Sequence, residues 1–558
     1  MKKKISVFVI TLVLCLIPCA NALAQGDTLR WGINSSPDGK FLSGISTSLY
    51  DSYVMQLTGD PLLWFDDLAA EETYLPRLAE SWEISEDMLT YTFHLAQGVV
   101  WHDGEPFSAE DVAFDFTTQC DARLNAGGYV ANWSKIEGAP EYHAYTDAVA
   151  HGEADGLTPV EGVSGIRIID DFTISITLTE VYAPFLSGAL NGFIIYPKHV
   201  WEQIPIDQWS TSDQLRSPVG TGAYRIERYE QDQYVTFTAN EDYFLGAPKI
   251  KNFVYKIVNE DTAQVELING ELDVISMLST PTDESMRTYT DNGIEITEFS
   301  YTGYVCMFYN TQLEKLGNAQ IRQGITTAIN RKGIVENLLN NHGCVMDAPI
   351  FYDSWAYPDD LNSYDYDPEA ALALLAEGGV SDTNGDGKLE LNGEPYTLSI
   401  LCPSGNKVRE QAAVVIQQNL AEIGIDVKLE TLEFNTVMER AYYDDDFEMA
   451  LIGWTTGLDP YTVYTAFCTE NQLVNGTANK SRWAMPELDE LMIAGTRTTD
   501  IAERTELYYQ IAHILNENQP ECWLYSPNQI RASRPELKNY ALNNSCEFLN
   551  VQDWYFEE

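Results

Sequence analysis

Strand patterns and helix patterns alternate along the whole chain, and no stretch repeats at a fixed period. Residues 89–95, 173–178 and 234–238 alternate apolar and polar side chains, as strands with one buried face do. Residues 406–424 and 500–518 carry apolar side chains at helical spacing. This mixture predicts an α/β or α+β protein with a large mixed core.

Local signals delimit one further helix and leave one segment without a pattern. Asp367 can cap the first turn of a helix, Pro368 fits its first position, and the glycines at 378–379 end it. The segment 121–165 is rich in glycine and alanine with scattered acids, and it predicts an irregular excursion within a domain.

The N-terminus has the features of a cleavable export signal. Three lysines at positions 2–4 precede an apolar run over 5–17, which is too short to span a bilayer as a helix. The motif at 22–24, Ala-Leu-Ala, matches the pattern that signal peptidase cleaves. We therefore predict a signal peptide over 1–24 and an exported mature protein. Cys19 leaves an alternative open, a lipoprotein cleaved before that cysteine.

The charge and the cysteines narrow the class of protein. A net charge of −51 repels nucleic acid and anionic lipid surfaces, which argues against both as partners. The cysteines after the signal include no C-x-x-C pair, so they fit neither a zinc site nor a small disulfide scaffold. One or two disulfides remain open after export. These cysteines are at positions 120, 306, 344, 402, 468, 522 and 546.

The stretch 98–116, "GVVWHDGEPFSAEDVAFDF", places a histidine among several acidic residues. Ser108 and Asp111 fit the two positions of a helix capping box, and the flanking apolar residues fit a hydrophobic staple. No second histidine stands at metal-ligand spacing. We therefore predict that the stretch builds the fold and that His102 is not catalytic.

Several stretches occur in the order found in one known family. The segment 75–114 closely resembles the family 5 solute-binding proteins of ABC importers, which include oligopeptide- and dipeptide-binding proteins: it contains P-x-L-A-x-S-W, Y-x-F-x-L and W-x-D-G-x-P-x-x-A-x-D-V. Four later stretches also resemble that family: "SPVGTGAYRI" (217–226), the region 239–274, "IRQGITTAINRKGIV" (321–335, with Gly324 where alanine is usual) and "IGWTTGLDP" (452–460).

The resemblance implies a fold and a domain order. It implies an α/β, periplasmic-binding-protein-like (class II) fold of two lobes with mixed sheets, an extra N-terminal subdomain, and a ligand cleft between the lobes. By analogy, the core lobe I comprises 25–68, 200–297 and 520–558, the inserted subdomain 69–199, and lobe II 298–519.

The resemblance also implies a function of capture and delivery, not catalysis. In that family the lobes close over a solute, and the closed form docks on an ABC permease in the cytoplasmic membrane. We therefore predict a monomeric substrate-binding protein without a cofactor. Its expected location is the periplasm or the outer face of the cytoplasmic membrane, and its first expected ligand is a peptide.

One departure from the family pattern concerns the ligand. Peptide-binding members carry an aspartate three residues after the tryptophan of the G-W element, and it pairs with the ligand's free amine. Here Trp454 fits, but Gly457 stands at that position and Asp459 is the nearest acid. A cleft without that acid should reject ammonium groups. An oligosaccharide or another non-peptide solute therefore stays open as the ligand.

A secreted hydrolase is the alternative from another class. The sequence has no G-x-S-x-G elbow and no H-E-x-x-H helix motif. Acids are plentiful, so spacing alone leaves a glycosidase pair open.

Motif position implies which side chains contact the ligand. They come from the first loop, from the segment after G-E-x-D, from the stretch before the first helix of lobe II, from the G-W element, and from the return to lobe I. The expected contacts are Tyr50, Met277, Tyr304, Tyr309, Trp454, Thr455 and Tyr525.

Residues 382–395 resemble the start of a calcium-binding loop. Asp382, Asn384 and Asp386 fit its first three ligand positions, and a glycine follows. Gly393 stands where the bidentate glutamate should be, and no helical frame surrounds the loop. We therefore expect a plain surface hairpin, with these three residues as the only metal candidates.

Overall fold

The computed structural model describes most of the chain. No helix in this part is long and apolar enough to cross a membrane. The predicted signal peptide, Cys19 and Met277 lie outside the described residues. Those residues are 27–46, 48–65, 73–124, 133–276, 282–473, 479–540, 543 and 546–557.

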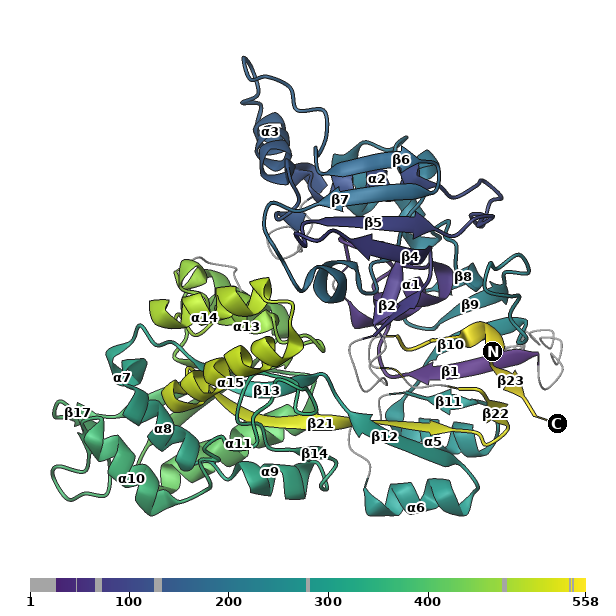
Figure 1. Cartoon of the computed structure of the whole chain (residues 1–558). Helices are drawn as coiled ribbons and strands as arrows, with labels where there is room; N and C mark the ends of the chain where they lie inside the picture. The colour runs from purple at the N-terminus through teal and green to yellow at the C-terminus, as the bar shows by residue number, and fades with distance from the viewer. Residues whose placement is uncertain are drawn as a thin grey trace, which may run out of the picture.

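One long strand, β21 (Glu521–Ser533), joins the two halves of the molecule. Its first part pairs with β13 (Gly303–Tyr309), and its last part pairs with β12 (Glu295–Ser300) and β11 (Val274–Ile275). Figure 1 shows it as a yellow ribbon running from one half into the other. We call the half that contains β11 lobe I and the half that contains β13 lobe II. The sheet order is β19-β18-β20-β13-β21-β11-β1-β10-β9-β8, so one hydrogen-bonded path spans both lobes.

Lobe I is built around β1 (Thr28–Ile33), whose apolar residues are buried. This strand runs parallel to β10 and β11, and antiparallel β9 and β8 extend the sheet. The other elements of lobe I are β8 (Tyr224–Glu230), β9 (Tyr234–Ala239), β10 (Asn252–Ile257), β22 (Leu537–Lys538), β23 (Tyr555–Phe556), α1 (Leu49–Thr58), α5 (Glu260–Ile268) and α6 (Asp283–Asp291).

The G-T-G motif before β8 has a packing role. A Cβ atom at Gly220 would lie 1.8 Å from the Thr58 carbonyl oxygen, and one at Gly222 would lie 2.4 Å from the Gly59 nitrogen. Only glycine permits this approach to the end of α1.

Lobe II has a sheet between two layers of helices. Alternate residues of β13 face different cores, because successive side chains of a strand point to opposite faces: Met307 and Tyr309 on one side, Tyr304 and Phe308 on the other. The remaining strands are β18 (Thr397–Pro403), β19 (Asp426–Leu432) and β20 (Met449–Thr455). The first layer contains α8 (Ala319–Thr327), α9 (Arg331–Leu338), α10 (Pro368–Glu377) and α11 (Lys407–Glu422). The second contains α12 (Phe434–Met438), α13 (Thr462–Phe467), α14 (Pro486–Arg497) and α15 (Ile501–Asn518).

A separate sheet forms the body of the third region, which we call the subdomain (residues 73–199). Its strand order is β4-β5-β7-β6, and α2 packs on it over a core of its own. Figure 1 shows this region above lobe I. Its main elements are β4 (Ala79–Ile84), β5 (Thr90–Leu95), β6 (Ile166–Asp170), β7 (Thr173–Thr177), α2 (Ala109–Gln119), α3 (Ala139–His151) and α4 (Lys198–Trp201). The small elements of the chain are β2 (Leu63–Phe65), β3 (Tyr74–Pro76), α7 (Glu314–Gly317), β14 (Gly343–Cys344), β15 (Val380–Ser381), β16 (Glu390–Leu391) and β17 (Glu394–Pro395).

The stretch 98–116 does build the subdomain. Ser108 caps α2 and the reciprocal Asp111 bond completes the predicted capping box, while Phe107 and Val112 are buried in one core. His102 joins the subdomain to lobe I: its ring nitrogens contact Gly220 N at 3.3 Å and Gly222 O at 3.0 Å. Burial lowers the pKa of His102 to about 4, so the ring is neutral at pH 7.

The prediction of an irregular segment over 121–165 is wrong for α3, a helix of 13 residues. Only Ala139 and Thr146 of this helix are buried, so it has no apolar stripe for periodicity to reveal. Its end signals are present, with proline in its first turn and Gly152 at its C-cap. The helices predicted at 367–377, 406–424 and 500–518 are confirmed as α10, α11 and α15.

The predicted domain boundaries stay predictions, and the structure adds where the chain crosses between lobes. Between β12 and β13 the crossing lies at 301–302. On the return, β21 pairs with β13 as far as Tyr525. Its next two residues, Ser526 and Pro527, pair with β14. No disulfide joins any of the described cysteines.

Candidate ligand-binding site

The strand β20 ends in the two residues of the predicted G-W element. Trp454 is half-buried and Thr455 is exposed. The Thr455 Oγ1 atom lies 3.1 Å from the hydroxyl of Tyr301, a residue in the crossing between β12 and β13. The predicted pair therefore lies at the junction of the two lobes. Sequence reasoning named Tyr304 and Tyr309 of the same stretch and missed Tyr301, which lies in the crossing just before β13.

Tyr50 lies on the lobe I side of the same junction. Its hydroxyl donates to Asn34 Oδ1 at 2.9 Å, and Asn34 directly follows β1. Ligands of open α/β sheets bind beyond the carboxyl ends of parallel strands, which is the position of Asn34. The Tyr50 ring lies edge-on to the Tyr53 ring, with centres 6.3 Å apart, and burial raises the pKa of Tyr53 well above its usual value. We call Asn34, Tyr50, Tyr301, Trp454 and Thr455 the hinge site.

A buried ion pair lies behind the hinge site in lobe I. Arg531 of β21 pairs with Glu547, and Ser276 Oγ donates to the Glu547 carboxylate at 3.2 Å. Both charged side chains are nearly inaccessible, and the Arg531 guanidinium lies 4.6 Å from the centre of the Phe299 ring. Burial raises the pKa of Glu547. The pair therefore ties β21 and the end of β11 to the C-terminal segment just beside the crossing.

Three of the predicted contacts lie inside lobe II. Tyr304 is 3% exposed and its hydroxyl donates to Glu521, while Tyr309 is fully buried with its hydroxyl 3.4 Å from Thr326 Oγ1. Tyr304 and Tyr309 face opposite sides of β13, so they cannot line one site. Tyr525 is 2% exposed in the core with Tyr309. These three rings offer no surface to a ligand in this structure, and our proposal does not include them.

The acid nearest to the departure at Gly457 is already paired. Asp459 is buried, and Arg504 donates to both of its carboxylate oxygens at 2.9–3.1 Å. Ser187 Oγ of the subdomain also donates to it, at 3.0 Å. Burial alone lowers the pKa of Arg504, but the negative charge of Asp459 raises it by more, so the pKa of Arg504 lies above its usual value. Asp459 is therefore committed to Arg504 and Ser187 and is not a free anchor for an ammonium group.

The bond from Ser187 belongs to a wider contact between the subdomain and lobe II. The Ala183 amide donates to the Thr496 carbonyl at 2.7 Å, and Arg497 forms an ion pair with Glu180. A Cβ atom at Gly188 would lie 2.8 Å from Cζ of Tyr461, so glycine is needed where that ring packs. The subdomain thus touches lobe II directly beside the G-W element.

Two surface pockets lie elsewhere. One, of about 670 Å³, is on the subdomain and has Phe114, Tyr142 and Trp201 in its wall. Its charged side chains Arg123 and Lys198 are already paired with acids. The other, of about 660 Å³, lies at the β18–β19 edge of lobe II. Neither includes a residue of the hinge site.

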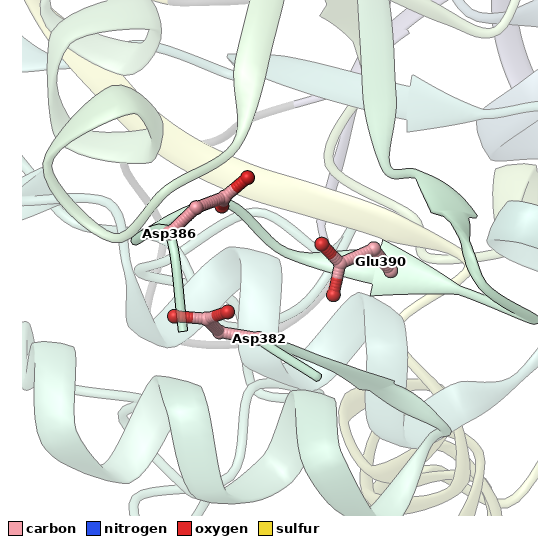
Figure 2. A group of neighbouring side chains, drawn as sticks. All are labelled: Asp382, Asp386 and Glu390. Atoms are coloured by element: carbon pink, nitrogen blue, oxygen red, sulfur yellow. The ribbon is translucent and has the colours of Figure 1, made fainter. Parts of the chain in front are cut away.

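Three carboxylates meet in the loop that resembles a calcium site. Asp382, Asp386 and Glu390 offer oxygens within 4.8 Å of one another. Figure 2 shows these three side chains in the loop. Sequence reasoning named Asp382, Asn384 and Asp386 and missed Glu390, which comes earlier in the loop than the usual glutamate. Glu390 is buried and accepts from Thr383 and from Asn384 Nδ2. Amides of the loop hydrogen-bond Asp382 and lower its pKa. Internal bonds thus account for this loop.

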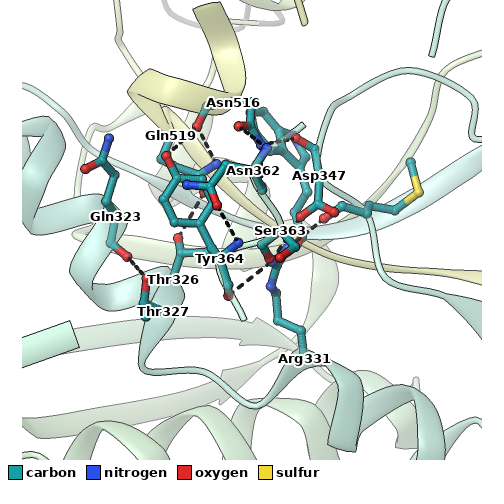
Figure 3. Close-up of polar contacts among 12 residues, drawn as sticks. Gln323, Thr326, Thr327, Arg331, Asp347, Asn362, Ser363, Tyr364, Asn516 and Gln519 are labelled. Carbon is teal, nitrogen blue, oxygen red and sulfur yellow. Dashed lines mark hydrogen bonds and ion pairs between the residues drawn. The ribbon is translucent and has the colours of Figure 1, made fainter. Parts of the chain in front are cut away.

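The arginine motif of 321–335 has a structural role. Arg331 donates to the carbonyl oxygens of Met346 and Trp523 at 2.7 and 2.8 Å and pairs with Asp347 at 3.0 Å. Figure 3 shows this guanidinium among polar groups that also tie the end of α15 to the loop at 362–364. Gly324 stands where the family usually has alanine, and it packs on α10. A Cβ atom at Gly324 would lie 2.8 Å from Leu375 Cγ.

Comparisons with known proteins agree with this architecture. The family model described as "Bacterial extracellular solute-binding proteins, family 5 Middle" matches residues 73–474. The oligopeptide-binding protein AppA of Bacillus subtilis is 28% identical over 485 residues, covering 86% of this chain and 83% of the relative. Its structure with a nonapeptide has a TM-score of 0.77 at 26% identity, covering 95% of this chain and 99% of that one. NikZ of Campylobacter jejuni in complex with Ni(L-His) also has a TM-score of 0.77, at 25% identity, covering 95% of this chain and 99% of that one. These matches confirm the predicted two-lobe fold.

Proposed function

Because the chain belongs to the family 5 bacterial extracellular solute-binding proteins, we propose that it captures a small peptide between its two lobes and delivers it to an ABC permease. The observation that carries this proposal is the hinge site itself. Tyr50 of α1 hydrogen-bonds Asn34 just after β1 in lobe I, and Thr455 at the end of β20 contacts Tyr301 in the crossing between the lobes, which β21 also passes. A solute bound there contacts both lobes and so favours the closed arrangement.

Of the predicted ligand contacts, we retain Trp454, Thr455 and Tyr50, and we add Tyr301 and Asn34. Trp454 provides a partly exposed aromatic ring, Thr455 and Tyr301 provide hydroxyls, and Asn34 provides an amide. Such a mixture of one aromatic surface and a few polar groups suits the main chain of a short peptide. The oligopeptide-binding relative supports this ligand class.

A non-peptide solute is the second candidate. Gly457 replaces the acid expected to anchor a ligand amine, and Asp459 is held by Arg504 and Ser187. A free N-terminal ammonium therefore has no partner at this point of the site. A solute without such a group, such as an oligosaccharide or a metal chelate, meets no such penalty, and the NikZ structure shows this fold with a nickel complex.

Thermal stability of the ligand-stripped protein tests both candidates. A ligand present at 100 times its dissociation constant adds about 2.7 kcal/mol to the unfolding free energy. We expect this rise with short peptides, and with N-acetylated peptides at least as strongly as with free ones. A rise with oligosaccharides or chelates alone would favour the second candidate, and no rise with any solute would refute capture.

The members of this family act in transport, and we propose that this chain has no catalytic activity of its own. Its incubation with peptides and oligosaccharides should give no cleavage products, whereas turnover would support a secreted hydrolase. We further propose that residues 1–24 are a signal peptide removed on export and that the mature protein is monomeric. Mass spectrometry of the exported protein distinguishes cleavage after Ala24 from a lipidated Cys19.

A further inference from the structure

The contact between the subdomain and lobe II is small and mixed in character. It combines one backbone hydrogen bond, one buried side-chain bond and one ion pair. The ring of Tyr182 also lies edge-on to that of Tyr461, with centres 6.5 Å apart. We call this contact the latch. It consists of Glu180, Tyr182, Ala183, Ser187 and Gly188 on the subdomain and of Asp459, Tyr461, Thr496 and Arg497 on lobe II.

The subdomain is attached to lobe I and moves with it. His102 binds the G-T-G motif of lobe I through both ring nitrogens. The Ile194 amide donates to Ser43 Oγ, in the segment before α1, at 3.1 Å. The crossing between the lobes lies at 301–302 and just after Tyr525, outside the subdomain. A rotation of the lobes at this crossing would therefore break the latch.

The ion pair of the latch leaves no charge stranded when it breaks. Glu180 pairs with Lys135 of the subdomain at 2.6 Å as well as with Arg497 of lobe II. Burial raises the pKa of Glu180, but the two cations lower it by more, so the net shift is downward. After opening, Glu180 keeps Lys135, and Arg497, whose side chain is already 52% exposed, returns to water.

The buried bond of the latch has the same property. Asp459 accepts from Arg504 and, at 3.0 Å, from the Tyr461 amide, and both donors belong to lobe II. Loss of the bond from Ser187 therefore removes one of several hydrogen bonds and leaves the buried carboxylate paired. The latch is thus favourable when the lobes are closed and costs little to break, as a reversible contact requires.

We propose that the latch sets how often the empty protein closes, and that it thereby sets the affinity for every ligand by the same factor. The apparent dissociation constant rises as the population of the binding-competent form falls. The latch contributes to that population without touching the solute. Its effect on affinity rests on the proposed function, whereas closure of the empty protein does not.

The test measures the distance between two spin labels in the ligand-stripped protein. The labels are placed on exposed positions of α3 and α14, as Glu141→Cys and Glu490→Cys, with the half-buried Cys344 replaced by serine. We expect a short and a long population of distances. Arg497→Gln and Ser187→Ala should each lower the ratio of short to long by about two- to fivefold.

Lys135→Gln should have the opposite effect. It removes the cation that Glu180 keeps in the open form, so Glu180 depends more on Arg497 and the short population should rise. A contact that only packs the two regions together predicts no such reversal. The matched control is Lys198→Gln, which breaks a partly exposed ion pair with Glu110 inside the subdomain and should leave the ratio unchanged.

Salt tests the ionic part of the latch. Raising the salt concentration from about 0.05 M to about 1 M should lower the short population of the wild type, because the pair of Glu180 and Arg497 is partly exposed. The same change should have little effect on Arg497→Gln, which lacks this pair.

The outcomes separate the latch from peptide capture. If solutes bind, Arg497→Gln should weaken each of them by the same factor, and unequal factors would overturn the proposal. If no solute binds but the populations shift as expected, then capture fails and the latch stands. If the wild type shows no short population, if the variants match the wild type, or if Lys135→Gln and Arg497→Gln shift the ratio in the same direction, then the latch is refuted, whatever the protein binds.

Discussion

Replacing Trp454 by alanine separates a binding role of this residue from a packing role. Burying a tryptophan side chain completely removes about 150–250 Å² from water. Trp454 keeps at most about a third of its surface exposed, so its buried part corresponds to roughly 130 Å². At about 25 cal/mol per Å², the loss of this part costs ~3 kcal/mol of stability without ligand. A ligand that covers the exposed part makes a contact of roughly 70 Å². Its loss should weaken binding by ~1.8 kcal/mol, or roughly 20-fold.

The two quantities are measured separately, by urea unfolding of ligand-stripped protein and by titration calorimetry with the peptide that stabilises it most. The matched control is Trp209→Ala, which truncates a fully buried tryptophan that packs against Tyr196 and Trp201. The control should lose about 3–5 kcal/mol of stability with unchanged affinity per folded molecule. If Trp454→Ala behaves like this control, then Trp454 is a packing residue and the hinge site is wrongly placed.

Three further predictions test features around the site. Arg504→Met should lower the unfolding free energy by about 3–5 kcal/mol in urea melts, because it leaves the Asp459 carboxylate buried without its cation. The control Arg497→Gln, at the partly exposed pair with Glu180, should change the unfolding free energy by less than about 1 kcal/mol. Similar losses in the two variants would contradict the assignment of Asp459 as the buried partner. The pKa of His102 is lowered from 6.5 to about 4 in the folded protein, so its contribution to stability is complete above pH 6.5 and is lost as the pH falls toward 4. His102→Asn should therefore flatten the plot of unfolding free energy against pH between 6.5 and 4. An unchanged slope would contradict the lowered pKa of His102. Glu390→Gln should lower the melting temperature equally in calcium and in EDTA, since it weakens the hydrogen bonds that Thr383 and Asn384 donate to the Glu390 carboxylate. A rise of the wild-type melting temperature with calcium would show instead that the carboxylates bind the ion.

Local sequence signals predicted much of the fold because the same residues make the local contacts. Asp367 caps α10 through two backbone amides, and Ser108 with Asp111 closes the capping box of α2. The helix α3 shows the limit of this reasoning. Its exposed surface carries no apolar period, so only its end signals mark it.

The hinge site could be predicted only in part, because its members come from distant parts of the chain. The motif named Trp454 and Thr455, which lie at the end of β20, and their role in binding stays a prediction. The same motif reasoning also named Tyr304 and Tyr309, since sequence position does not show which face of β13 a side chain takes. Lys480, whose Nζ atom lies 2.9 Å from the centre of the Trp454 ring, belongs to no motif.

The position of β21 near the end of the chain has a consequence for how the protein folds during synthesis or export. β1, β11 and β13 lie far upstream, yet residues 521–533 are needed to complete the sheet in both lobes. These pairings have a high contact order, and such contacts form slowly because long loops must close first. A chain that emerges N-terminus first therefore cannot complete either lobe until residue 533 is available. A truncation that removes β21 would leave exposed strand edges in both lobes at once.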